Sequence, residues 1–164
     1  MTRPLHLTDL AGVVYSAGKV FDGLSTRRRD TENFLANGST DGISSRADLT
    51  LLDDLRDTAQ YLLDHTPAVD AHTVCALNTQ ISRSGALHPG QLRADDQQIG
   101  VKTRYGRHTP PALTEPRLQR LVDDTVTGDD PADDAINLFI ALATAQPFED
   151  GNKRTALFAA NSLY

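Results

Sequence analysis

Apolar residues return every three or four positions along most of the chain, which is the spacing of one face of an α-helix. The pattern is clearest after Asp48, where leucines and alanines recur until Pro67 ends the run. Residues that can cap a helix precede several such runs, namely Thr8, Asp70, Thr114 and Asp130. Helices are therefore expected over about 9–22, over 31–37, from 48 to 67, from 70 to before 85, from 114 to about 125, from 130 to 147 and over 154–163.

The segment from His88 to Pro111 has a different pattern. It is rich in glycine and proline, and its apolar residues alternate with polar ones, which predicts a short β-hairpin around Tyr105 and Gly106. The helix from 130 to 147 is apolar on nearly all sides and is expected to be a central buried helix. The expected architecture is a single all-α domain with one short hairpin.

Composition excludes several classes of protein. The chain has 164 residues, a net charge of −6 and a pI near 5.2, so bulk binding of nucleic acid is not expected. Cys75 is the only cysteine, which excludes an internal disulfide. No apolar run approaches the ~20 residues of a membrane span, and no secretory signal is evident, so a cytoplasmic location is expected. Aspartate pairs such as Asp53-Asp54 and Asp133-Asp134 are expected to be solvated surface residues and caps.

One dense polar segment joins the last two apolar helices. It reads Gln146-Pro147-Phe148-Glu149-Asp150-Gly151-Asn152-Lys153-Arg154. Gly151 and Asn152 at a helix start would let backbone N–H groups point outward together, which favours an anion. Lys153 and Arg154 place two cations at the end of the helix that prefers acids, and phosphate is the anion that such a pair suits. Asp150 beside a phosphate would suit a Mg²⁺ ligand. An ordinary charged turn between two helices is the alternative.

The same segment resembles the signature of the Fic/Doc family, His-x-Phe-x-(Asp/Glu)-Gly-Asn-(Gly/Lys)-Arg. Eight of its nine positions fit, the two x positions being free. The run Pro89-Gly90-Gln91-Leu92-Arg93, then Ile99-Gly100-Val101, then Pro110-Pro111 resembles the hairpin of the family, a flap that holds the target segment. The resemblance covers about residues 45–164. It implies a compact α-helical Fic core and transfer of AMP from ATP to a Ser, Thr or Tyr hydroxyl of a target protein.

The resemblance also implies roles for single residues. Gly151 and Asn152 would bind the α- and β-phosphates, Asp150 would hold Mg²⁺, and Arg154 would bind an outer phosphate. Lys153 stands where many adenylyltransferases have glycine, and lysine there also occurs in the Doc branch, whose founding toxin is a protein kinase. Phosphoryl transfer is thus an alternative activity. A second family arginine, three residues after the first, is replaced by Leu157 in this chain.

Gln146 occupies the position of the catalytic histidine of the family. A histidine can accept the proton of the attacking hydroxyl near neutral pH, whereas a glutamine amide can only form hydrogen bonds. Losing a general base typically costs ~10²–10⁴-fold in rate, so turnover should be crippled while nucleotide binding persists. The site could be that of a natural pseudoenzyme, an inactivated form of an active parent, or one in which His108 supplies the base.

The N-terminal region, residues 1–44, is expected to be helical and to precede a Fic-type core over 45–164. Many family members carry an inhibitory helix whose glutamate pairs with the motif arginine. Glu32 followed by Asn33 fits the end of that pattern, although Arg28 replaces the serine or threonine four positions earlier. The expected partners are a target protein and an antitoxin or other inhibitory protein, with no membrane. A non-catalytic, nucleotide-binding half of a toxin–antitoxin pair is the competing function.

Overall fold

The computed structural model describes residues 5–65, 68–85, 87–94, 101–103, 106–108 and 110–163. In these ranges the chain forms a short 3₁₀-helix, Leu7–Leu10, followed by helices and two strands. The elements are α1 Ala11–Phe21, α2 Arg28–Asn37, α3 Arg46–His65, α4 Ala71–Thr79, β1 Val101–Thr103, β2 Gly106–His108, α5 Glu115–Thr125, α6 Pro131–Ala145 and α7 Asn152–Asn161. The prediction of an all-α fold is confirmed.

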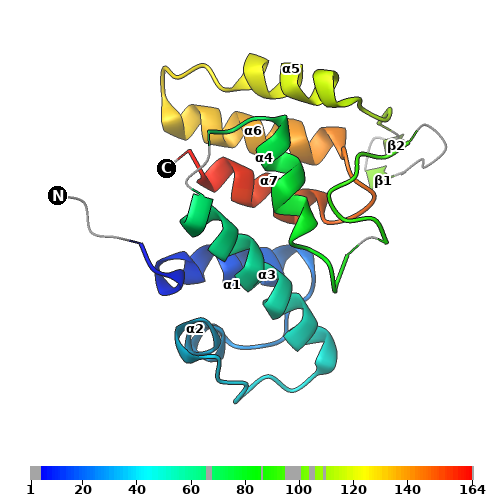
Figure 1. The fold of residues 1–164 in the computed structure, drawn as a ribbon. Helices are drawn as coiled ribbons and strands as arrows, with labels where there is room; N and C mark the ends of the chain where they lie inside the picture. The colour runs from blue at the N-terminus through cyan, green and yellow to red at the C-terminus, as the bar shows by residue number, and fades with distance from the viewer. Residues whose placement is uncertain are drawn as a thin grey trace.

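Helix α7 is the centre of the bundle. It packs against α1, α3, α4 and α6, and its Ala156, Phe158 and Ala159 are fully buried. Figure 1 shows α5 and α6 on one side of α7 and helices α1 to α3 on the other. The alanines of α7 allow other helices to approach closely from several sides. The helix that follows the polar segment is therefore packed on several sides by other helices.

The prediction that α6 is buried on all sides is wrong. Its Ile136 and Ile140 are 58% and 55% exposed, because among the described elements α6 packs mainly against α7 and α5, with Phe139 stacked on Phe21 of α1, and leaves one side open. An apolar helix is central only when neighbouring helices cover all its sides. The number of neighbouring helices cannot be predicted from the sequence of the helix itself.

Local caps follow the sequence closely. The side chain of Asp70 accepts a hydrogen bond from the N–H of Thr73 at 2.7 Å, and Thr114 and Asp130 cap α5 and α6 in the same way. The predicted cap at Thr8 is wrong, because Leu7–Leu10 form a separate 3₁₀-helix in which His6 N–H donates to Asp9 Oδ2 at 2.8 Å. Helix α1 therefore begins at Ala11 rather than at residue 9.

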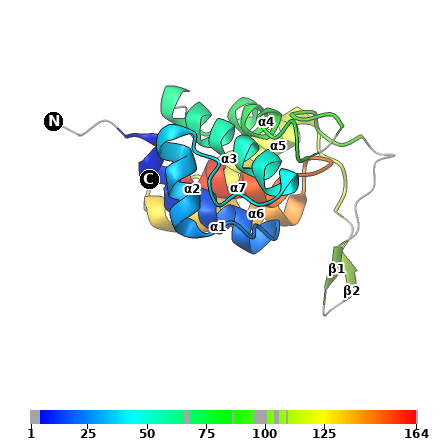
Figure 2. The ribbon, with the colours of Figure 1, turned by 90° about the horizontal axis from the view of Figure 1, so that it is seen from below.

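Strands β1 and β2 pair antiparallel, with Val101 opposite His108 and Thr103 opposite Gly106. They project from one end of the helical body, as Figure 2 shows. Just before them in the chain, Leu92 forms an isolated antiparallel bridge with Phe148 in the segment before α7. The segment that precedes the hairpin in the chain, residues 87–94, which we call its base, is thus attached to the polar segment. Two of the predicted flap residues, Ile99 and Gly100, lie outside the described residues.

Three aspartates are buried and fix loops. Each carboxylate accepts hydrogen bonds from the backbone N–H groups of two consecutive loop residues and from at least one hydroxyl group. The groups are Asp48 with Ser25 and Thr26, Asp54 with Arg83 and Ser84, and Asp134 with Thr127 and Gly128. The expectation that Asp54 and Asp134 are solvated is therefore wrong. A loop packed against helices has backbone donors that need acceptors, and a short carboxylate supplies them.

The N-terminal helices share the core of the rest of the chain. Val14 and Ala17 of α1 belong to one apolar cluster with Leu52 of α3 and Phe158 of α7. Residues of 1–44 and of 45–164 therefore form a single hydrophobic core. In the part of the chain that the structure describes, no helix has the length and apolar character needed to cross a bilayer.

Candidate functional site

The turn between α6 and α7 is closed by two hydrogen bonds from one side chain. Asn152 Oδ1 accepts from the N–H of Phe148 at 2.8 Å, and Asn152 Nδ2 donates to the carbonyl of Phe148 at 2.9 Å. Phe148 is buried, so its ring anchors the turn in the core. The side chain of Asn152 therefore fixes the turn, and its backbone forms the first residue of α7.

Gly151 is the N-cap of α7 and adopts the left-handed conformation, with φ of 73°. A Cβ at this position would lie 3.0 Å from Ile81 Cδ1 and 3.3 Å from Asn78 Nδ2. Both the conformation and the close approach favour glycine. Since the first N–H groups of a helix have no partners within it, this start of α7 is a suitable place for an anion.

Asn78 of α4 binds the turn through its side-chain amide. Its amide is 2% exposed, and Nδ2 donates to the carbonyl of Asp150 at 3.0 Å and to Thr155 Oγ1 at 3.1 Å. Its Oδ1 accepts from the N–H of Gly90 at 2.8 Å. One buried amide thus joins the polar turn, the first turn of α7 and the segment that leads to the hairpin.

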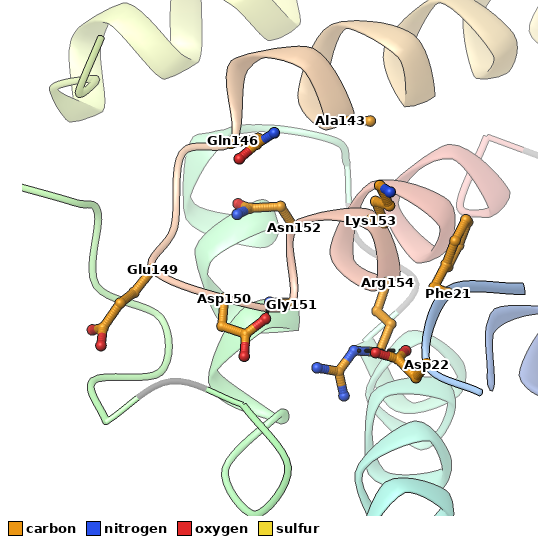
Figure 3. Close-up of a pocket in the computed structure, with 10 residues that line it drawn as sticks. All are labelled: Phe21, Asp22, Ala143, Gln146, Glu149, Asp150, Gly151, Asn152, Lys153 and Arg154. Carbon is orange, nitrogen blue, oxygen red and sulfur yellow. Dashed lines mark hydrogen bonds and ion pairs between the residues drawn. The ribbon is translucent and has the colours of Figure 1, made fainter. Parts of the chain in front are cut away.

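A cavity of about 210 Å³ opens at this turn. Figure 3 shows its lining, which includes every polar residue of the predicted phosphate site and two residues of the N-terminal region. The lining residues are Phe21, Asp22, Ala143, Gln146, Glu149, Asp150, Gly151, Asn152, Lys153 and Arg154. The structure therefore brings the predicted site residues 146 and 150–154 together around one space.

The two cations of the segment differ in environment. Lys153 is exposed, whereas Arg154 is only 3% exposed. Arg154 Nη1 donates to Ser84 Oγ at 2.8 Å, Nη2 donates to the carbonyl of Ser84 at 3.2 Å, and Nε lies 3.2 Å from Asp22 Oδ2. Ser84 is itself fixed by the buried carboxylate of Asp54. The Arg154 guanidinium is thus preorganised, and one of its edges already holds a carboxylate.

The carboxylate of Asp22 has an unfavourable electrostatic environment. Burial raises the pKa of Asp22 above its ordinary value of 3.8, the charge of Arg154 lowers it only in part, and Asp150 raises it further. Asp22, Glu149 and Asp150 place three carboxylates around the cavity, against the two cations. The cavity lining therefore has three carboxyl groups against two cationic side chains, although the start of α7 favours an anion.

Asp150 can supply a ligand for Mg²⁺, but only together with other oxygens. Its Oδ1 accepts from the N–H of Gly151 at 2.7 Å, and the residue is exposed on the cavity. Among the described residues, no three His, Cys, Asp or Glu side chains lie close enough to hold a metal ion by themselves. Mg²⁺ is commonly held by one or two carboxylates plus phosphate oxygens, so this donor set fits Mg²⁺ bound with a nucleotide.

Gln146 lines the cavity from the end of α6. It is the C-cap of that helix and has φ of 45° and ψ of 62°, the left-handed conformation that non-glycine residues seldom adopt. Its carbonyl accepts a 2.7 Å hydrogen bond from Nε of Arg93. Position 146 is thus fixed by its backbone, and the residue there carries no group that can accept a proton near neutral pH.

The predicted inhibitory residue Glu32 has a different partner. Its carboxylate lies 3.1 Å from Nε of Arg28 on the same helix, and both side chains are largely exposed. The carboxylate that contacts Arg154 comes from Asp22 instead. Of the other candidate residues, Val101 is in β1, and the side chain of His108 lies outside the described residues.

Several residues of the site were missed by sequence reasoning. Asp22, Asn78 and Ser84 contact the motif from positions that are 50 or more residues away along the chain. Arg93, which the sequence places only in the run that resembles the flap, contacts the motif as well. His88 also reaches the turn, with Nδ1 3.3 Å from Glu149 Oε2. Asn78 offered one signal, because an amide on an apolar helix face needs a partner when it is buried. Asp22, next to Gly23, carried no comparable signal.

Comparison with known proteins supports the family resemblance. The Fic/DOC family model matches residues 68–164, which is more than half of the chain. No match is found among curated proteins. The matched range includes α4, the hairpin strands and all of the turn between α6 and α7, so the cavity described above lies largely within it. The chain belongs to the Fic/DOC family.

Proposed function

We propose that this protein binds ATP with Mg²⁺ at the start of α7 and transfers AMP, slowly, to a Ser, Thr or Tyr hydroxyl of a target protein. One observation carries the proposal. The glycine-capped start of α7, Lys153 and Arg154 all line the same cavity. Backbone N–H groups at a helix start and a fixed guanidinium are groups that bind phosphate oxygens. Family membership supports a nucleotide as the source of that phosphate.

Charge around the cavity explains why Mg²⁺ belongs to the proposal. Three carboxylates line the cavity with Lys153 and Arg154, and Arg154 is already paired with Asp22. A polyphosphate added to these groups would meet net repulsion unless a cation came with it. Asp150 would hold Mg²⁺ through its exposed carboxylate while phosphate oxygens complete the coordination. The metal supplies charge neutralisation and orients the phosphates.

Gln146 explains why the transfer should be slow. In transfer of AMP, the target oxygen bonds to the α-phosphorus while the bond from that phosphorus to pyrophosphate breaks, and the hydroxyl proton must be accepted. The Gln146 amide can hydrogen-bond the hydroxyl but cannot take its proton. Histidine at this position would supply a base with a pKa near neutrality. A rate gain of about 10²–10⁴-fold is therefore expected for Gln146→His.

Lys153 and Gln146 each support an alternative to AMP transfer. Lys153 is shared with the Doc branch and favours transfer of the γ-phosphoryl group. Gln146 favours nucleotide binding without transfer, as in one half of a toxin–antitoxin pair with an antitoxin or inhibitory partner. These functions share the cavity. AMP transfer breaks the bond from the α-phosphorus to pyrophosphate, transfer of the γ-phosphoryl group breaks the bond from the γ-phosphorus to ADP, and binding alone breaks neither.

Two labels distinguish the activities. The protein and its Gln146→His variant are incubated with cell extract and with ATP labelled at the α- or the γ-phosphate. Label transferred from the α-position supports adenylylation, and label from the γ-position alone supports a kinase. Binding without transfer by either form supports the non-catalytic function.

Binding itself is tested with a matched pair of lysines. Lys153→Met removes a cation from the cavity, and Lys19→Met removes one from the exposed side of α1, so both change the net charge equally. Calorimetry with Mg-ATP should show a dissociation constant raised about three- to tenfold by Lys153→Met only. Equal effects of the two substitutions, or no binding by the unmodified protein, would contradict the site.

A further inference from the structure

Arg93 lies where the base of the hairpin meets the turn that carries position 146. Its side chain is 3% exposed. Nε donates to the carbonyl of Gln146 at 2.7 Å, and Nη2 donates to the carbonyl of Ala145 at 3.4 Å. Its backbone N–H donates to the carbonyl of Pro147 at 2.9 Å. We propose that Arg93 is a positioning residue that fixes the hairpin to position 146.

The same guanidinium also reaches the segment that follows the two strands. Nη2 lies 3.3 Å from the carbonyl of Pro110 and 3.4 Å from that of Pro111. Arg93 precedes the two strands in the chain, and the two prolines follow them. One buried side chain from the segment before the strands therefore binds both the segment after the strands and the end of α6. A planar guanidinium with five N–H donors can serve carbonyls in several directions, which a single ammonium group cannot match.

Position 146 is sensitive to this contact because of its backbone. Among the described residues, Gln146 is the only non-glycine residue with a positive φ. The left-handed conformation is unfavourable for a residue with a Cβ and persists only where the surroundings hold it. The bond from Arg93 is a charge-assisted one to the carbonyl of that residue, so it stabilises the conformation that directs residue 146 to the cavity.

The consequence concerns the geometry of transfer and rests on the proposed function. If the hairpin holds the target segment, its position relative to residue 146 sets where the target hydroxyl meets the bound nucleotide. Effective transfer needs reacting atoms within about 3–3.5 Å of each other, so a loose hairpin would lower the rate without weakening nucleotide binding. Arg93 does not line the cavity, which separates its role from that of Lys153 and Arg154.

A double-mutant cycle tests the link to position 146 without any nucleotide. Urea unfolding is measured for the unmodified protein, Arg93→Met, Gln146→Gly and the double variant. Glycine adopts the left-handed conformation unaided, so the drop in folding equilibrium constant caused by Arg93→Met should be smaller, by a factor of about three or more, when glycine is at 146. Independent effects, with the two drops equal within about twofold, would overturn the proposal. If Arg93→Met does not fold, Arg93→Lys replaces it in the cycle.

The second readout is transfer. In the Gln146→His form, Arg93→Lys should lower label transfer from ATP to proteins of the extract at least about tenfold, with the dissociation constant of Mg-ATP changed less than about twofold. Arg117→Met, which alters an exposed arginine of α5, is the control and should leave both unchanged. An unchanged transfer rate in Arg93→Lys overturns the proposal. If no form binds Mg-ATP, the proposed function fails, and the unfolding cycle still decides the role of Arg93.

Discussion

Nε of Arg154 lies 3.2 Å from Oδ2 of Asp22, so a carboxylate from the end of α1 occupies one edge of the arginine expected to bind phosphate. A phosphate oxygen and this carboxylate would compete for the same guanidinium. The ion pair is partly buried, because the Arg154 side chain is 3% exposed and that of Asp22 is 26% exposed. The N-terminal region therefore contributes a carboxylate to the site, from a residue other than Glu32.

Asp22→Asn should tighten binding of Mg-ATP. The substitution removes one of three carboxylates around the cavity and releases the charge of Arg154 for the nucleotide. Because the pair is still partly solvated, the expected gain in affinity is about three- to tenfold. Calorimetry measures it, with Asp124→Asn on the exposed face of α5 as a control of equal charge change. A matching gain in the control would attribute the effect to net charge alone.

The effect of Asp22 should depend on pH. Since burial raises the pKa of Asp22, this group binds its proton at a higher pH than a surface aspartate does. As the pH falls through that raised pKa, the carboxylate loses its charge and no longer competes for Arg154. The ratio of the Mg-ATP dissociation constants of the unmodified protein and Asp22→Asn should therefore approach one as the pH is lowered. Protonation of the nucleotide affects both dissociation constants equally and cancels in their ratio. A ratio that does not change with pH would contradict the prediction.

Asn78→Asp should disorganise the turn before α7. An aspartate keeps the acceptor for the N–H of Gly90 but loses the donor to the carbonyl of Asp150 and to Thr155 Oγ1. Leaving buried groups unpaired costs about 1–3 kcal/mol, which urea unfolding can measure, and Mg-ATP binding should weaken as well. Gln80→Ala, near the same end of α4, removes only a 3.4 Å contact to Ala76 and should change neither quantity appreciably.

Asp48→Asn should lower the stability of the protein at neutral pH. It should also reduce the loss of stability that the protein shows as the pH falls. Burial alone would raise the pKa of Asp48, but hydrogen bonds from Thr26 and Ser25 outweigh it, so this pKa is lower than 3.8 in the folded protein. A lowered pKa contributes stability that is present above the unfolded value, about 3.9, and is lost as the pH falls through the folded value.

The expected cost of Asp48→Asn at neutral pH is about 1–3 kcal/mol, because Asn keeps one acceptor oxygen and loses the charge. Unfolding free energies measured across the acid range should show the difference between the two proteins shrinking toward low pH. Asp124→Asn serves again as the control, and a difference that does not shrink would show that the ionised form of Asp48 is not what holds residues 25 and 26.

Local features of the fold could be predicted from the sequence, and distant ones could not. The caps at Asp70, Thr114 and Asp130 depend on residues two or three positions away, so the chain around each of them is sufficient. The exposure of Ile136 depends instead on how many helices surround α6. Likewise, the sequence around Asp54 predicts a surface residue, because its burial depends on the distant loop at Ser84 that packs against it.

The candidate site divides in the same way. The residues of the turn lie together in sequence, and their chemistry follows from their residue types and spacing alone. Its partners Asp22, Asn78 and Arg93 are brought to it by packing of α1 and α4 and by the base of the hairpin. Specific ion pairs and buried amides between distant segments depend on tertiary geometry, which hydrophobic periodicity does not encode.

The shared core of α1 and α7 has a consequence for how this fold can be divided. The family model begins at residue 68, yet Val14 and Ala17 of α1 are fully buried in the same cluster as Phe158 of α7. Residues 68–164 on their own would leave that side of α7 open to water and would lose the carboxylate at Arg154. The segment that identifies the family is therefore smaller than the unit that folds, and an excised copy of it is expected to aggregate rather than to act as a portable module.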